Sequence, residues 1–139
     1  MTIDGSTEVG TELFALTRVI DRARLVRYAG ASGDFNPIHW NERFATDVGL
    51  PGVIAHGMLT MGLAGAALTD WLGEPGRLVS YGVRFTRTVP VPDPGEVAVD
   101  IRAVVGAVDV DAGTVRVDLT VSVEGSNVLG KAQAVVRSQ

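Results

Sequence analysis

An aspartate and a histidine five residues apart are the strongest candidates for chemistry in this sequence. Asp34 and His39 lie on either side of an Asn36-Pro37 pair. Pro37 fixes its own φ angle and pushes Asn36 toward an extended conformation, so the turn is rigid. A carboxylic acid and an imidazole that such a turn directs into one cavity can act as an acid/base pair, because their ordinary pKa values differ. The sequence therefore predicts proton transfer at Asp34 and His39.

Other roles for these side chains remain open from residue type alone. Asp34 can cap the turn that follows it, and His39 can be a hydrogen-bonded histidine of the interior. Together with His56 they also offer three groups of the kind that bind metal ions, but their spacing matches no recognised ligand pattern. We expect no metal here.

The composition of the chain excludes several kinds of site and of binding partner. The chain has 139 residues, of which 46% are apolar, and no cysteine. One globular domain over residues 1–139 is expected, and a disulfide framework, a cysteine-ligated zinc site and a thiol nucleophile are excluded. The net charge of −4 and the lack of a Lys/Arg cluster argue against nucleic-acid binding.

Neither membrane insertion nor export is expected. The longest apolar stretch, residues 57–68, is much shorter than the roughly 20 apolar residues that span a bilayer. Residues 1–10 contain neither the basic nor the apolar segment of a signal peptide. We therefore expect a cytoplasmic protein with no membrane partner.

The elements that must position the two side chains are mostly helical in the first half of the chain. Residues 11–20 alternate as a strand does, and Asp21 can cap a helix that ends at Gly30 to Gly33. A short helix is expected at residues 41–48. A longer, apolar helix is expected from Gly57 to about Trp71, before a Gly-Glu-Pro-Gly stop.

The second half of the chain predicts long antiparallel strands joined by hairpins. The strands are expected at 78–88, 96–110 and 114–136, with turns at 90–95, 111–113 and 125–127. Gly62, Gly65 and Ala66 give the long helix little bulk, so either another element packs closely against it or an acyl chain runs beside it. The order of elements predicts an α+β hot-dog fold, in which one curved antiparallel sheet wraps around one long apolar helix.

Three sequence segments resemble one known family. Residues 32–39, with Tyr28 before them and Ala45 after them, are similar to the hydratase motif of MaoC-like (R)-specific enoyl hydratases and dehydratases. The similarity continues through residues 55–62 and 81–86, and so covers nearly the whole chain. Within the family, the chain most resembles the catalytic B-type subunit of the (3R)-hydroxyacyl-acyl carrier protein dehydratase of type II fatty acid synthesis.

The resemblance implies a lyase that dehydrates a (3R)-3-hydroxyacyl thioester, or hydrates the trans-2-enoyl thioester. His39 would take the C2 proton and Asp34 would assist loss of the C3 hydroxyl, the two titrating as a coupled pair. The backbone N–H of Gly57, at the start of the long helix, would bind the thioester oxygen. Asn36 would either orient the pair or only form the turn, and His56 would have a supporting, structural role.

The resemblance also implies the carrier and the partner. No cofactor is expected beyond the phosphopantetheine of the substrate, on acyl carrier protein in fatty acid biosynthesis or on coenzyme A in a degradative or tailoring pathway. Arg84, Arg87 and Lys131 either meet that carrier or are solvated surface residues. Hot-dog subunits associate through their sheets, so a homodimer or heterodimer is expected, and the resemblance favours a second, different hot-dog subunit.

Two further functions are weaker alternatives. A carboxylate on this fold can activate water for hydrolysis of the thioester, which would make the protein an acyl thioesterase. A non-catalytic subunit that binds acyl chains would be expected to lack the acid/base pair, which this sequence retains.

Overall fold

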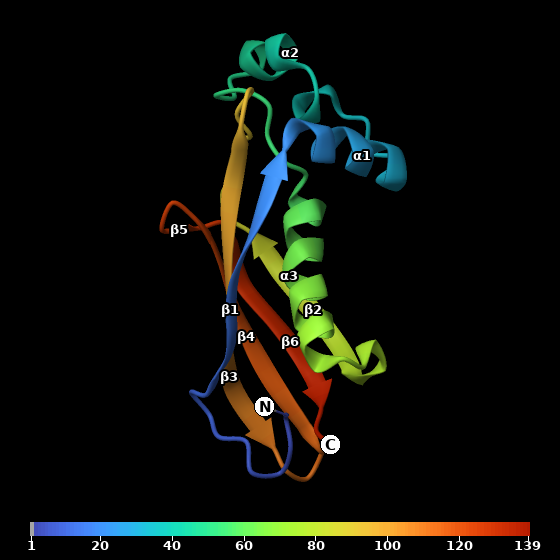
Figure 1. Ribbon diagram of the computed structural model, residues 1–139, viewed down its shortest axis with the longest axis vertical. Coiled ribbons are helices and arrows are strands. Elements are labelled where there is room, and N and C mark those ends of the chain that lie inside the picture. Colours follow the sequence, from blue (N-terminus) through green and yellow to red (C-terminus); the bar gives the residue numbers. More distant parts are fainter. Residues whose placement is uncertain (1) are drawn as a thin grey trace.

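One antiparallel sheet curves around a central helix in the computed structural model, which describes residues 2–139 (Figure 1). The strand order is β1-β3-β4-β6-β2, with the short β5 paired to β4. The strands are β1 (Glu12–Asp21), β2 (Leu78–Phe85), β3 (Glu96–Asp109), β4 (Thr114–Val123), β5 (Ser126–Asn127) and β6 (Leu129–Arg137), and the central helix is α3 (Gly57–Leu72). This confirms the predicted α+β hot-dog fold.

The core lies between the concave face of the sheet and α3. Along β3 the side chains of Val99, Ile101 and Val105 are buried, while the intervening positions face solvent, as the two-residue period of a strand requires. Leu68 of α3 is completely buried against this layer. The opposite face of α3 is open to solvent, and Met58 on it is 57% exposed.

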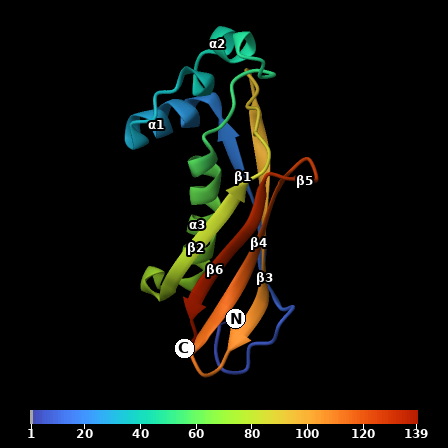
Figure 2. The same ribbon diagram turned by 180° about the vertical axis from the view of Figure 1, so that it is seen from behind.

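The helices between β1 and α3 form a lobe beyond one end of the sheet, opposite the end where the two termini lie (Figures 1 and 2). The lobe comprises α1 (Arg22–Ser32), the 3-10 helix η1 (Pro37–His39) and α2 (Glu42–Asp47). The Asp21 carboxylate caps α1 by accepting a hydrogen bond from Arg24 N–H at 2.8 Å, as predicted. Gly33 ends α1 with a φ of 76°, a conformation that favours glycine.

The long helix also begins and ends close to where the sequence predicts. It ends one residue later than expected, and Gly73 closes it with a φ of 72°. A further 3-10 turn, η2 (Pro75–Arg77), follows before β2. No helix among residues 2–139 combines the length and the apolarity needed to cross a membrane.

The predicted hairpin at residues 90–95 is wrong. β2 pairs with β6, and β3 pairs with β1 and β4, so the connection between β2 and β3 joins strands that are not neighbours. Val89 and Val91 of this connection are buried, and its backbone bonds to residues 53–55: Ala55 N–H donates to the Val89 carbonyl and Val91 N–H to the Val53 carbonyl. These apolar residues and backbone bonds hold the connection against residues 53–55, which join the lobe to α3.

Two strand boundaries also differ from the prediction. β2 ends at Phe85, three residues early. The expected turn at residues 125–127 is centred instead on Glu124 and Gly125, whose φ angles of 50° and 78° suit a two-residue hairpin loop. Ser126 and Asn127 therefore belong to β5 and pair with the end of β4.

Candidate active site

His39 is held by the backbone of a distant segment. It ends η1, where Pro37 starts the turn and the Asn36 side chain caps it by accepting from Ile38 N–H at 3.2 Å. The ring is buried, and its Nδ1 lies 2.7 Å from the carbonyl oxygen of Ile54. A carbonyl only accepts hydrogen bonds, so the neutral imidazole carries its proton on Nδ1 and leaves the Nε2 lone pair free.

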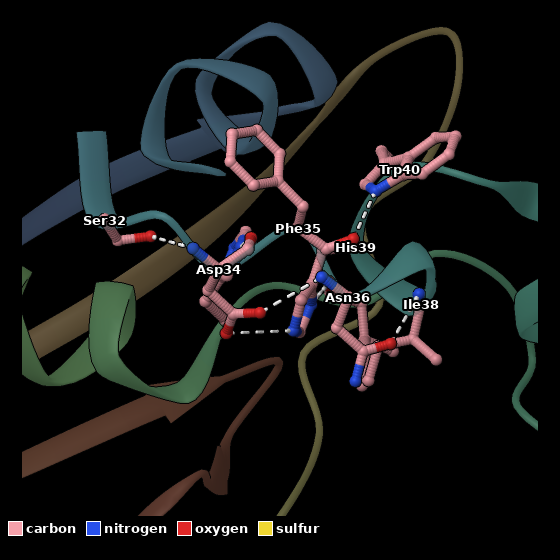
Figure 3. Close-up of polar contacts among 9 residues, drawn as sticks. Ser32, Asp34, Phe35, Asn36, Ile38, His39 and Trp40 are labelled. Atoms are coloured by element: carbon pink, nitrogen blue, oxygen red, sulfur yellow. Dashed lines mark hydrogen bonds and ion pairs between the residues drawn. The ribbon is translucent and has the colours of Figure 1, made fainter. Parts of the chain in front are cut away.

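Asp34 faces that free nitrogen. Its Oδ2 lies 3.9 Å from His39 Nε2, and the two side chains point toward each other (Figure 3). Its other oxygen, Oδ1, accepts a hydrogen bond from Asn36 N–H at 3.1 Å. The structure thus brings the predicted acid and base together. Asn36 serves this geometry in two ways, since its side chain forms the turn and its backbone N–H fixes Asp34.

His56 contacts both members of the pair. Its ring stacks on that of His39, with centroids 3.8 Å apart and planes 21° apart. Its Nε2 lies 3.1 Å from the Asp34 carbonyl oxygen, to which it donates. The Tyr28 ring packs edge-on against the His56 ring, with ring centroids 4.7 Å apart and planes 65° apart. His56 therefore supports the Asp34 backbone and the His39 ring at once.

The environment of His56 favours its uncharged form. Burial lowers the pKa of the His56 imidazole below its ordinary value, and the positive charge that His39 can carry lowers it further, whereas the bond to the Asp34 carbonyl opposes the shift. The second ring nitrogen, Nδ1, is buried and has no hydrogen-bond partner among residues 2–139. A neutral ring can occupy this place with less desolvation cost than an imidazolium.

The three residues do not fit a metal site, although one atom from each of Asp34, His39 and His56 lies within 4.8 Å of the others. Metal ions bind imidazoles in the ring plane, and the two rings are stacked at 3.8 Å with planes only 21° apart. One ion therefore cannot lie in the planes of both rings at bonding distance.

The pair opens into a pocket of about 440 Å³ at the N-terminus of α3. Its walls are the first turn of α3, the residues after β2 and the start of β6, and most of the pocket surface is apolar. Arg87 is the one cation among the described lining residues. Thr60 also lines the pocket, and its buried hydroxyl has no hydrogen-bond partner in the part of the chain that the structure describes. Arg84 and Lys131 instead line a separate surface hollow with Arg116.

Gly57 is the first residue of α3 and lines this pocket. The first N–H groups of a helix have no acceptor within the helix, and no side chain caps this one. A Cβ atom at Gly57 would lie 2.9 Å from the Phe85 ring. The missing side chain therefore makes room for Phe85, a contact that sequence reasoning did not anticipate.

Three functional positions were missed from the sequence. Ile54 orients His39 through a main-chain oxygen, which no residue type signals. Phe85 covers Gly57 from a strand that is distant in sequence. Thr60 lies one helical turn after His56 on a helix with a predictable start, so helical spacing could have placed it near the site.

Comparison with known proteins agrees with this geometry. The family model described as MaoC like domain matches residues 6–126. The chain therefore belongs to the MaoC-like domain family.

Similar proteins include both an enzyme and solved structures. The 3-hydroxybutyryl-CoA dehydratase of Methylorubrum extorquens is 38% identical over 96 residues, which are 68% of this chain and 60% of that enzyme. A solved MaoC-like dehydratase has a TM-score of 0.95 and 37% identity, covering 99% of this chain and 43% of that one. An (R)-hydratase from A. caviae involved in PHA biosynthesis has a TM-score of 0.82 and 26% identity, covering 97% and 99% of the two chains. The chain spans 25% and 60% of the length of two curated relatives it matches.

Proposed function

We propose that this protein is a hydro-lyase that interconverts a (3R)-3-hydroxyacyl thioester and its trans-2-enoyl thioester. The observation that carries the proposal is the pairing of a free His39 Nε2 with Asp34 Oδ2, 3.9 Å away, at the end of a mostly apolar pocket. The names of its relatives, a 3-hydroxybutyryl-CoA dehydratase and an (R)-hydratase, support both the reaction and its stereochemistry.

In the dehydration direction, His39 Nε2 takes the proton from C2. The electron pair of the broken C2–H bond then forms the C2–C3 double bond. The C–O bond at C3 breaks, and the hydroxyl leaves as water with a proton from Asp34, which starts this direction as the acid and ends as the carboxylate, while His39 ends as the imidazolium. The proton lost from C2 and the hydroxyl lost from C3 balance the water released. The pair therefore ends with the proton count with which it began, and hydration runs the same steps backward.

The α3 N-terminus supplies the other requirement of this chemistry. Removing a proton beside a thioester builds negative charge on the carbonyl oxygen, which a helix N-terminus stabilises. The Gly57 N–H is the donor we assign to that oxygen. Thr60, with its unpaired hydroxyl, lies in the same first turn of the helix, within reach of a bound acyl chain.

The carrier is tested by comparing two substrates. We expect loss of enoyl absorbance when the purified protein is mixed with a trans-2-enoyl-coenzyme A, with no release of free thiol. The same acyl group on acyl carrier protein should react faster if the chain serves fatty acid synthesis, and slower if it serves a degradative or tailoring pathway. Release of thiol without loss of the double bond would identify a thioesterase and contradict the proposal.

We also propose that the chain works with a second hot-dog subunit. β2 is an edge strand of the sheet, and Val79 and Phe85 on it are more than half exposed. A partner strand would satisfy the unpaired backbone groups of that edge and cover these side chains. Light scattering of the pure protein should give twice the monomer mass if the subunits are identical. A monomer that gains activity only with a different hot-dog subunit would indicate the heterodimer that the resemblance favours.

A further inference from the structure

We propose that Thr60 is a positioning residue whose hydroxyl donates a hydrogen bond to Nδ1 of His56 and so fixes the ring on which His39 is stacked. The inference rests on the proposed function, because His39 is the assigned base. It starts from two buried polar atoms, Thr60 Oγ1 and His56 Nδ1, which have no hydrogen-bond partner within residues 2–139. Both residues are only 2% exposed, and both line the pocket of the acid/base pair.

The two atoms have complementary hydrogen-bonding capacity. His56 Nε2 donates to the Asp34 carbonyl oxygen at 3.1 Å, so the neutral ring carries its proton there and Nδ1 has a lone pair that only accepts. The Thr60 hydroxyl has a proton to donate. Buried polar atoms that stay unpaired are rare and costly, and a bond between these two satisfies both at once.

The helix places Thr60 on the same side as His56. His56 is the N-cap of α3, and Thr60 follows four residues later, which is the spacing at which side chains on a helix are neighbours. His56, Thr60 and Ala64 are all buried, so this row of side chains faces the interior.

The acceptor that a helical threonine normally uses is already occupied. A threonine hydroxyl in a helix often donates to the carbonyl oxygen four residues before it, which here belongs to His56. That oxygen accepts the Leu59 N–H at 3.0 Å and the Thr60 N–H at 3.3 Å, which uses both of its lone pairs. Rotation about the Thr60 Cα–Cβ bond moves the hydroxyl between staggered positions. Of the acceptors on His56, Nδ1 is the one that the described part of the chain leaves open.

The bond holds the His56 ring at a second point. The Nε2 bond alone fixes one corner of the ring and leaves the ring able to tilt about that contact, whereas a bond at Nδ1 opposes the tilt. The His39 ring is stacked on this ring, with centroids 3.8 Å apart and planes 21° apart, so a tilt of one ring displaces the other. Thr60 therefore acts on the base through His56.

A double-mutant cycle in urea unfolding tests the bond without any substrate. Thr60→Val keeps the shape of the side chain and removes the hydroxyl, and His56→Phe keeps a ring without nitrogen atoms. We expect the two substitutions to be coupled by about tenfold in the equilibrium constant of unfolding.

Thr69→Val is the matched control. Thr69 lies on the same helix, and its hydroxyl donates to the Ala66 carbonyl oxygen at 3.2 Å, away from the pocket. Its coupling to His56→Phe should stay within about twofold. Circular dichroism checks that each variant folds. If Thr60→Val does not fold, Thr60→Ala removes the same hydroxyl, and His56→Leu replaces His56→Phe in the same way.

Kinetics separate positioning from contact with the substrate. For hydration of trans-2-butenoyl-coenzyme A, Thr60→Val should lower kcat by about five- to tenfold and leave KM within about twofold. Thr60→Ser keeps a hydroxyl and should recover roughly half or more of the wild-type kcat. Thr69→Val should match the wild type in both constants.

The outcomes separate the two proposals. Coupling within about twofold between Thr60→Val and His56→Phe, or a Thr60→Val more stable than the wild type, indicates an unpaired hydroxyl and overturns the inference alone. A Thr60→Val that raises KM at unchanged kcat also overturns it, because Thr60 then contacts the acyl chain. A wild type that hydrates no enoyl thioester, on coenzyme A or on acyl carrier protein, overturns the proposed function and the role of Thr60 toward the base, while the unfolding cycle still decides whether the bond exists.

Discussion

The sheet-wrapped part of α3 and the lobe that precedes it are built on different principles. In the lower part of α3, Leu63, Leu68 and Leu72 are all buried against the sheet. In the lobe, Phe35 is 62% exposed, Trp40 is 50% exposed and Phe44 is 40% exposed. The first region is stabilised by apolar burial, whereas the second leaves several large apolar side chains exposed and depends more on individual polar contacts.

Those polar contacts determine the site. Side-chain oxygens cap each short element of the lobe, Asp21 at α1, Asn36 at η1 and Asn41 at α2. The Trp40 indole N–H donates to the Phe35 carbonyl at 2.9 Å, which closes the loop outside Asp34 and His39 (Figure 3). Stability and chemistry are therefore separable here, and substitutions in the two regions should have different effects.

The largest effect is expected from Asp34→Asn. The substitution keeps the size of a half-exposed side chain but removes the carboxylate, so kcat should fall by about a thousandfold while the free energy of unfolding changes by less than about 1 kcal/mol. His39→Gln should cause a similar loss of kcat. Kinetics and urea unfolding on the same samples measure both quantities. A variant that retained more than a tenth of wild-type kcat would remove the residue from the chemistry.

The reverse pattern is expected from Leu68→Ala. This side chain is completely buried, so the truncation should lower the free energy of unfolding by about 3 kcal/mol. Phe44→Ala in the lobe is the control, with an expected cost below about 1.5 kcal/mol because the ring is 40% exposed. Urea unfolding measures both values. Equal losses of unfolding free energy for the two variants would mean that side chains of the lobe and of the core contribute equally to stability.

A pH-dependent effect is expected from His56. Because its pKa is lowered in the folded state, the unfolded chain binds more protons below the ordinary value of 6.5. The stability contributed by neutral His56 is present above that pH and is lost as the pH falls toward the folded-state pKa. The slope cannot exceed about 1.4 kcal/mol per pH unit for one group.

Urea unfolding between pH 7.5 and 5 measures this slope in the wild type and in His56→Gln. The glutamine can still donate to the Asp34 carbonyl but does not titrate, so its stability should depend less on pH in this range. The same slope in both proteins would show that another group is responsible.

The smallest effect is expected from Asn36→Ala. Loss of the η1 cap should lower the free energy of unfolding by about 1 kcal/mol or less. Because the same turn aims Asp34 and His39, kcat should fall several-fold, and Asn36→Asp, which keeps the capping oxygen, should restore most of the stability. A loss of stability without any change in kcat would separate the turn from the alignment of the pair.

Local signals made the helices and the site motif predictable. Asp21, Gly33 and Gly73 mark helix ends through their own backbone and capping chemistry, and each does so in the structure. Asp34 and His39 were found because one rigid turn, within six residues, brings them together.

Contacts between distant segments were not predictable. The pairing of β2 with β6, rather than with β3, depends on which strands share the core, and alternation alone cannot order strands. The rings of Phe85 and Tyr81 fit against Gly57 and Gly65 only after β2 lies beside α3. A glycine in a helix shows that space is left, but it does not show what fills that space.

The Ile54 carbonyl that orients His39 has a consequence for how the site tolerates variation. Every amino acid carries the same main-chain oxygen, so substitution at position 54 changes the pocket wall without removing the acceptor. The same short segment is fixed by backbone bonds to Ile38 and Val89. The proton location on the His39 imidazole is therefore set by the chain path rather than by a side chain, so substitutions in the neighbouring sequence can reshape the pocket while the orientation of this ring is kept.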